Sequence, residues 1–144
     1  MAFRNATAEW KGDLESGSGS FEGSSGKLRG DYSAGSRFGD SGGTNPEELV
    51  AAAHASCFSM ALALALSQGG NPPDSIRTEA RVQLLKEGEG FAIKKIDLIT
   101  VGRVPGIDDA AFQEAAQAAK AGCPISLALA AVPEITLDAT LEAG

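Results

Sequence analysis

The sequence predicts an α+β fold in which an antiparallel sheet packs on a long central helix. Segments that alternate between apolar and polar residues recur along the chain, separated by glycine-rich turns. One apolar stretch of helical length starts directly after an Asn-Pro pair. The later strand segments come as a hairpin pair, which favours antiparallel pairing over parallel βαβ winding.

The composition is that of an ordinary globular chain, with 43% apolar and 22% charged residues among 144. We expect a single domain over residues 1–144, which is large enough to fold without disulfides. The net charge of −7 argues against nucleic acid and anionic membranes as partners. One histidine and two cysteines are too few for a zinc-finger pattern. We therefore expect no metal and no cofactor.

Residues 1–44 are predicted to form short strands. Residues 12–43 contain ten of the 18 glycines and eight serines, a composition that also suits a flexible linker. Apolar residues such as Phe21, Leu28 and Tyr32 are spaced between the glycines. This interleaving favours strands joined by Gly-Ser turns.

A long central helix is predicted over about residues 46–68. Asn45 suits the N-cap and Pro46 the first helical position, while Glu48 can reach back as in a capping box. The following Gly69-Gly70 ends the helix. Almost every position is apolar or small, so we expect it to be buried on most faces.

The remaining elements follow in order. Two strands are expected over about residues 76–104, with a hairpin turn at Gly88-Glu89-Gly90. A helix is expected over about 109–121, a short helix over 124–130 and a last strand over 134–142.

The chain shows no export or membrane signal. Met1 to Trp10 is polar and lacks the apolar core of a signal peptide. Leu49 to Leu66 is long enough to cross a bilayer, but it is rich in alanine and interrupted by polar residues. We expect a cytoplasmic protein, in which cysteines are kept reduced and are more often reactive than structural.

The two cysteines occupy different local settings. Cys123 stands at the start of the turn opened by Pro124, where the helix dipole favours a thiolate. Cys57 lies mid-helix among alanines, so burial raises its pKa unless a cation approaches. Either cysteine could instead be a packed small hydrophobe. The nearby His54 fits a core histidine better than a base, and Arg37 is either a turn residue or the missing cation.

Two segments resemble the signature motifs of the OsmC/Ohr family, the osmotically inducible protein C and organic hydroperoxide resistance proteins. The first is Asn45-Pro46-Glu47-Glu48-Leu49 followed by Ala53–Leu62. The second is Ala121–Ser126, which contains the second cysteine. The likeness covers essentially the whole chain, and the residues from His54 onward are closer to the OsmC branch.

The resemblance implies a thiol-dependent peroxidase for organic hydroperoxides, active in oxidative and osmotic stress defence. It implies an intertwined homodimer with active sites at the subunit interface. Cys57 is then the peroxidatic cysteine and Cys123 the resolving one, forming a disulfide that a thiol reductant, such as a lipoylated protein, reduces. Arg37 faces the reactive sulfur, and Glu47 orients Arg37.

Helix geometry adds an expectation about the second subunit. Glu47 precedes Cys57 by ten residues, which is about 15 Å along the axis at ~1.5 Å per residue. A glutamate–arginine pair cannot bridge that distance on one chain. We therefore expect Glu47 and Arg37 to reach the Cys57 site from the other subunit.

Two alternatives stay open at this stage. One is a hydrolase or thioesterase with Cys57 as nucleophile and His54 as base. It needs an oxyanion hole that the sequence does not show, and it leaves Cys123 without a role. The other is a non-enzymatic redox-sensing or binding domain on the same fold.

Overall fold

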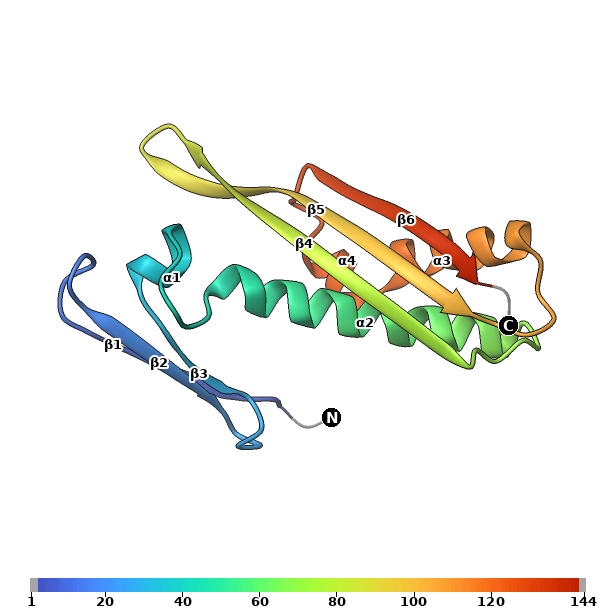
Figure 1. The fold of residues 1–144 in the computed structure, drawn as a ribbon, viewed down its shortest axis with the longest axis horizontal. Helices are drawn as coiled ribbons and strands as arrows, with labels where there is room; N and C mark the ends of the chain where they lie inside the picture. Colours follow the sequence, from blue (N-terminus) through green and yellow to red (C-terminus); the bar gives the residue numbers. More distant parts are fainter. Residues whose placement is uncertain (1–2, 143–144) are drawn as a thin grey trace. The chain divides into compact units, whose positions relative to one another are not determined.

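The computed structural model describes residues 3–142 and shows a mixed α+β chain with two small sheets (Figure 1). The elements fall into two compact units that divide between Leu49 and Val50, and each is described by itself. Residues 1 and 2 of the predicted strand region and the last two residues of the predicted domain lie outside the described residues.

The first unit holds a three-stranded antiparallel meander. Its strands are β1 (Ala6–Lys11), β2 (Ser18–Gly23) and β3 (Arg29–Tyr32), paired in the order β1-β2-β3. The glycine-rich segment therefore forms strands rather than a flexible linker.

Aromatic rings gather on one face of this sheet, where two glycines make room for them. The Tyr32 ring lies 5.6 Å from Trp10 and 6.2 Å from Phe21, measured between centroids. A Cβ atom at Gly19 would lie 2.5 Å from the Tyr32 ring, and one at Gly30 would lie 2.9 Å from Phe21. The glycines of these strands thus serve ring packing as well as turns.

A short helix, α1 (Ala34–Phe38), lies in the region predicted to contain strands only. Ser33 caps it by accepting a hydrogen bond from the Ser36 backbone N–H at 3.1 Å, and the Ser36 hydroxyl accepts from the Ser33 backbone N–H at 2.9 Å. This reciprocal cap needs only a second hydroxyl three residues after the first. The prediction missed it because the same serines also suit turns.

The central helix α2 (Pro46–Gln68) begins as the Asn-Pro pair predicts. The Asn45 side chain accepts a hydrogen bond from the Glu48 backbone N–H at 2.8 Å. We expected the Glu48 side chain to reach back to the Asn45 backbone N–H as in a capping box, and this prediction is wrong. Its carboxylate accepts a 2.6 Å hydrogen bond from the Thr44 hydroxyl, a competing donor just before the helix.

The second unit contains a hairpin of β4 (Ser75–Glu87) and β5 (Gly90–Arg103). Its two-residue turn places Gly88 at a φ of 61°, a left-handed conformation that glycine adopts without strain.

The last strand, β6 (Glu134–Glu142), runs parallel to β5, so the expectation of a purely antiparallel sheet is wrong. The connection from β5 to β6 contains α3 (Asp109–Gly122) and α4 (Pro124–Ala128). Parallel neighbours need such a long crossover, whereas a hairpin turn supplies only antiparallel pairing. Alternating residues in the last strand could not show its direction.

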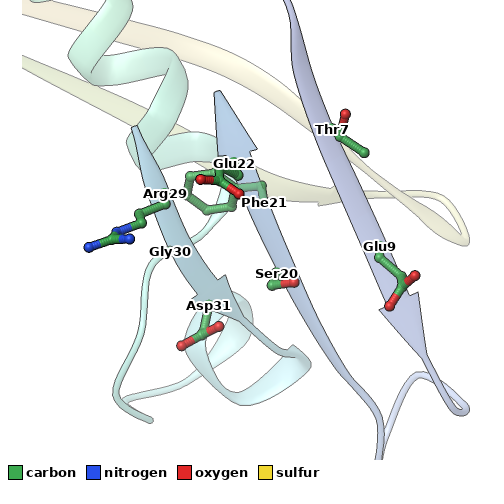
Figure 2. A pocket seen from close by; sticks show the side chains of 8 residues that line it. All are labelled: Thr7, Glu9, Ser20, Phe21, Glu22, Arg29, Gly30 and Asp31. Atoms are coloured by element: carbon green, nitrogen blue, oxygen red, sulfur yellow. The ribbon is translucent and has the colours of Figure 1, made fainter. Parts of the chain in front are cut away.

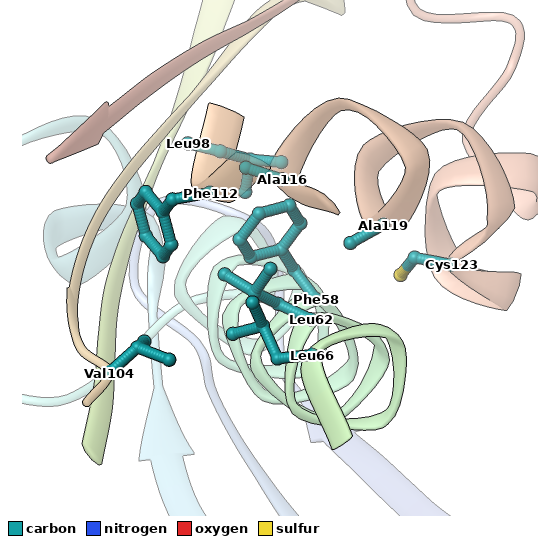
Figure 3. Close-up of a cluster of buried hydrophobic side chains, with 9 residues drawn as sticks. All are labelled: Phe58, Leu62, Leu66, Leu98, Val104, Phe112, Ala116, Ala119 and Cys123. Carbon is teal, nitrogen blue, oxygen red and sulfur yellow. The ribbon is translucent and has the colours of Figure 1, made fainter. Parts of the chain in front are cut away.

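The core of the second unit lies between α2, α3 and β5 (Figure 3). Its buried members are Phe58, Leu62, Leu66, Leu98, Val104, Phe112, Ala116, Ala119 and Cys123. The α2 contribution recurs every four residues, as one helix face requires. Gly102 admits the Phe112 ring, since a Cβ there would lie 2.5 Å from the ring.

The α2 helix is less buried than its sequence predicts. Only 22% of its most apolar window is buried, and by length and composition the helix could cross a membrane. Five of the exposed residues form a continuous stripe along one side of the helix, namely Ala53, Ser56, Met60, Leu64 and Ser67. The expectation of burial on most faces is wrong for the single chain, because the elements of the second unit cover only the opposite side.

Candidate functional site

The two thiols come together in the second unit. Cys57 lies on α2, and Cys123 lies between α3 and α4, where it caps both helices. Cys123 is fully buried, Cys57 is partly exposed, and both are free thiols. A hydrogen bond between them raises the pKa of Cys57 and lowers that of Cys123.

The surroundings shift the pKa values of the two thiols in opposite directions. Burial raises the pKa of the Cys57 thiol, and the Cys123 sulfur raises it further. Burial also opposes ionisation of Cys123, but the hydrogen bond from Cys57 and the backbone and hydroxyl groups of Ser126 outweigh it and lower its pKa. Although Cys123 is the N-cap of α4, its side chain makes no capping hydrogen bond. This ranking is the one that local reasoning from the sequence predicts.

Cys57 opens onto an apolar groove of about 660 Å³. The groove is lined by Cys57, Met60, Ala61, Leu64, Ala65, Gln68, Ala118, Ala119, Gly122 and Pro124. All but Gln68 present apolar or small surfaces beside the sulfur. An alkyl chain would fit these walls better than a small polar solute.

Arg37 and Glu47 form an ion pair within the first unit. Arg37 comes from the last turn of α1, and Glu47 from the first turn of α2. Arg37 Nη2 lies 2.6 Å from Glu47 Oε1, while Arg37 Nε lies 3.2 Å from both carboxylate oxygens. The hydrogen bond to Glu47 raises the pKa of the Arg37 guanidinium, although its partial burial acts the other way. The Glu47 side chain is only 11% exposed, so the pair is held in one orientation.

Neighbouring residues fix both ends of this ion pair. The buried Ser36 hydroxyl donates to the Thr44 carbonyl at 2.7 Å, and the Asn45 amide donates to the Ser36 carbonyl at 3.1 Å. These contacts tie α1 to the start of α2. The Arg37 guanidinium also lies over the Phe38 ring at 5.5 Å.

His54 contacts α4 from the same helix as Cys57. Its Nε2 lies 2.7 Å from the Ser126 hydroxyl, its Nδ1 has no hydrogen-bond partner, and the residue is fully buried. Burial lowers its pKa, so the imidazole is neutral at pH 7. Because its contact is with Ser126, the geometry does not support the hydrolase alternative, in which His54 serves Cys57 as a base. Ser126 is the residue that sequence reasoning missed, although it closes the second cysteine motif.

A second hollow lies on the polar face of the first sheet (Figure 2). It measures about 530 Å³ and carries the side chains of Glu9, Glu22, Arg29 and Asp31. No cysteine lines it, so it is not the candidate site for thiol chemistry. Among residues 3–142, no group of three histidine, cysteine or acidic side chains is arranged to hold a metal ion.

The structure thus assembles the predicted site residues as two pairs. Cys57 meets Cys123 in one unit, and Arg37 meets Glu47 in the other. The catalytic role of each residue stays a prediction.

Comparison with known proteins gives a consistent family. Residues 39–138 match the family model described as OsmC-like protein. The chain is 49% identical to Peroxiredoxin OsmC of Escherichia coli (strain K12) over 140 residues, which is 96% of each chain. This near full-length similarity supports a peroxidase-type redox function.

Solved structures show the same fold. The organic hydroperoxide resistance protein OhrB of Bacillus subtilis matches with a TM-score of 0.68 and 27% identity, covering 96% of this chain and 98% of that one. An organic hydroperoxide resistance protein OsmC of Legionella pneumophila matches with a TM-score of 0.74 and 24% identity, covering 97% and 99%. With its two cysteine motifs, its fold and its family model in agreement, this chain belongs to the OsmC-like protein family.

Proposed function

We propose that this chain is a cysteine-based peroxidase that reduces organic hydroperoxides to alcohols. The observation that carries the proposal is the pairing of two thiols, one of which opens onto an apolar groove. The names of its relatives, Peroxiredoxin OsmC and organic hydroperoxide resistance protein, support the same chemistry. A role in oxidative stress defence follows from this activity, and a role in osmotic stress defence is proposed from the resemblance to the OsmC branch alone.

In the first step, the Cys57 thiolate attacks one peroxide oxygen. The S–O bond forms as the O–O bond breaks, and the alkoxide leaves as an alcohol after taking a proton. Cys57 becomes a sulfenic acid. The apolar groove beside Cys57 would hold the alkyl part of the substrate, which hydrogen peroxide lacks.

The first step needs a cation, because burial raises the pKa of Cys57. We assign this role to Arg37, whose guanidinium stays charged at physiological pH and can donate to both the thiolate and the developing oxyanion. Glu47 would orient it through their two-point contact. Each such donor typically contributes about 2.7–4 kcal/mol at a transition state.

In the second step, Cys123 attacks the Cys57 sulfenic acid, forms a disulfide and releases water. Each thiol already affects the pKa of the other, which supports their pairing in this step. An external dithiol, such as a lipoylated protein, would then return both thiols by exchange. We propose a cytoplasmic location, where such reductants are maintained, and no metal or cofactor.

We propose a homodimer as the working form. The uncovered stripe of α2 carries no charge and consists of alanine, serine, methionine and leucine side chains, which suits packing against a second copy. The helical rise of about 15 Å between Glu47 and Cys57 supports an active site completed by the Arg37–Glu47 pair of the partner. Neither nucleic acid nor a membrane is needed in this scheme.

The test is the loss of cumene or tert-butyl hydroperoxide with dithiothreitol or a lipoylated protein as reductant, run beside hydrogen peroxide. We expect faster turnover of the organic peroxides and none in Cys57→Ser. Full turnover by Cys57→Ser would overturn the assignment. A reversible disulfide without turnover would instead favour a redox-sensing domain.

A further inference from the structure

Within the second unit, a buried hydrogen bond joins the helix that carries Cys57 to the helix that Cys123 begins. His54 on α2 and Ser126 on α4 are 0% and 8% exposed, and His54 Nε2 lies 2.7 Å from the Ser126 hydroxyl. The peroxidase scheme gives neither residue a role. Breaking such a contact is costly, because each buried group is then left without its partner.

The hydrogen bond lies about one helical turn from each cysteine. His54 precedes Cys57 by three residues on α2, so the two side chains lie on the same side of that helix. Ser126 follows Cys123 by three residues, and Cys123 is the N-cap of α4. Three residues span about 4.5 Å along a helix axis, at ~1.5 Å per residue. The contact therefore sets the spacing of α2 and α4 close to both sulfurs.

Backbone hydrogen bonds connect Cys123 firmly to the helices on either side. Its N–H donates to the Ala119 carbonyl at 2.9 Å, and its carbonyl accepts from the Leu127 N–H at 3.0 Å. Cys123 itself has no exposed surface. A displacement of Ser126 is therefore transmitted to Cys123 through the helical turn that joins them.

Cys57 faces this segment from α2. Its side chain packs against the buried cluster that includes Cys123. Gly122 and Pro124, which flank Cys123 in the sequence, line the apolar groove together with Cys57. A disulfide requires its two Cβ atoms to lie about 3.5–4.5 Å apart, a range of only ~1 Å. A small shift of α4 against α2 would therefore take the two sulfurs out of bonding geometry.

We propose that the His54–Ser126 hydrogen bond positions α4 against α2 so that Cys123 can close a disulfide with Cys57. His54 and Ser126 are positioning residues, because they act on the sulfurs through the helices that carry them. The place of this closure in a catalytic cycle rests on the proposed peroxidase function. The closure itself can be measured without peroxide.

The closing step is balanced with either of two oxidants. After reaction with peroxide, Cys123 attacks the Cys57 sulfenic acid: the S–S bond forms, the S–O bond breaks, and the departing hydroxide takes the Cys123 proton and leaves as water. With glutathione disulfide, the Cys57 thiolate first releases one glutathione and forms a mixed disulfide. Cys123 then attacks the Cys57 sulfur and releases the second glutathione.

The first test equilibrates the full chain in buffers of reduced and oxidised glutathione and measures the disulfide by intact mass after acid quenching. We expect Ser126→Ala to lower the equilibrium constant for disulfide formation about three- to tenfold, the factor that loss of one hydrogen bond gives. Ser126→Thr keeps the hydroxyl and should restore the parent value. His54→Gln should do the same, because its amide can donate from near the position of Nε2.

The second test removes the same hydrogen bond from its other side. His54→Leu should lower the constant by a similar factor, and it provides a separate measurement if Ser126→Ala does not fold. The double variant should lose no more than either single variant, because only one interaction is removed. Additive losses would show that the two residues act separately, and would overturn the proposal.

Ser59→Ala is the matched control, because Ser59 also lies on α2 and donates one 2.8 Å hydrogen bond, to Thr78 on β4. It should lower the free energy of unfolding in urea yet keep the parent equilibrium constant. An equal fall of the constant in Ser59→Ala would mean a general loss of stability and overturn the positioning role. An unchanged constant in a folded Ser126→Ala protein would overturn it as well.

The third test adds one equivalent of cumene hydroperoxide in the presence of dimedone. Ser126→Ala should consume the peroxide at the parent rate, but its ratio of dimedone adduct to disulfide should rise, because the sulfenic acid of Cys57 waits longer for Cys123. A ratio equal to that of the parent would contradict the role in resolution. If the parent forms no sulfenic acid, the peroxidase function fails, and the glutathione measurement still decides whether the hydrogen bond positions the thiols.

Discussion

Arg37 binds Glu47 through two guanidinium nitrogens, with Nη2 at 2.6 Å from one carboxylate oxygen and Nε at 3.2 Å from both. The guanidinium plane is thereby fixed, and the side of Arg37 that does not face Glu47 is free to donate elsewhere. Arg37 is 38% exposed along its side chain, and Glu47 is 11% exposed. The Glu47 carboxylate is therefore held in place, while the Arg37 guanidinium stays accessible.

Loss of the Arg37–Glu47 ion pair should reduce peroxidase activity more than it reduces the stability of the fold. We expect Arg37→Lys to lower kcat/KM for cumene hydroperoxide by 10²- to 10³-fold, the usual effect of one transition-state donor, since lysine keeps the charge but loses the planar fork. Glu47→Gln should cost about tenfold. Arg81→Lys is the control, because Arg81 pairs with Glu79 on the exposed surface of β4. Equal losses in Arg81→Lys would contradict the assigned role.

The two cysteines should fail in different ways. Cys57→Ser should give no reaction with organic peroxide, because the attacking sulfur is absent. Cys123→Ser should give one rapid turnover and then stop at the sulfenic acid, which dimedone traps. In the unmodified chain, peroxide should remove two hydrogens per monomer. Rapid-quench kinetics with mass spectrometry separates these outcomes, and a Cys123→Ser protein that cycles at the full rate would exclude Cys123 as the resolving residue.

Stability should fall on the acid side because of His54. Burial holds its folded-state pKa below the ordinary value of 6.5. As the pH falls through 6.5, His54 binds a proton in the unfolded chain but not in the folded chain, so the free energy of unfolding decreases. The slope from this group is at most ~1.4 kcal/mol per pH unit. Urea unfolding between pH 5 and pH 8 should show this slope in the parent and lose it in His54→Gln; equal slopes would disprove it.

A charge on the uncovered stripe of α2 should break the proposed dimer. Met60 is 75% exposed in the single chain, and a lysine there would be buried without a partner against a second copy. Sedimentation velocity should show a dimeric parent and a monomeric Met60→Lys protein. Leu85→Lys, on β4 at 42% exposure, should stay dimeric. A monomeric parent would refute the assembly itself.

Gly102 should tolerate no side chain. A Cβ there would lie 2.5 Å from the fully buried Phe112 ring, so the ring or the strand would have to shift within the core. We expect Gly102→Ala to lower the free energy of unfolding by about 1–3 kcal/mol, the usual range for overpacking. Gly122→Ala meets nothing within 4 Å and should be neutral or slightly stabilising. Urea unfolding midpoints compare the two, and equal stabilities would refute the steric account.

The features that sequence could predict are the local ones. Asn45 and Pro46 start α2 through contacts within four residues, and Gly88 closes a two-residue turn. Such features need no knowledge of distant partners.

The features that sequence missed depend on long-range contacts. Alternation in β6 shows which residues share a face but not which way the strand runs. The exposed side of α2 and the burial of the opposite side depend on which elements pack there. Ser126 is a small polar residue in a short helix, and only its contact with His54, 72 residues earlier, marks it out.

The parallel pairing of β5 and β6 also affects when, during folding, the two thiols become able to form a disulfide. Hairpin contacts between β4 and β5 are local and form early, whereas β6 docks only after the chain through α3 and α4 has crossed over. Cys123 lies within that crossover, so the thiol pair assembles only when the crossover packs against α2. A refolding chain should therefore regain helix and hairpin signals first and peroxide-dependent disulfide formation last.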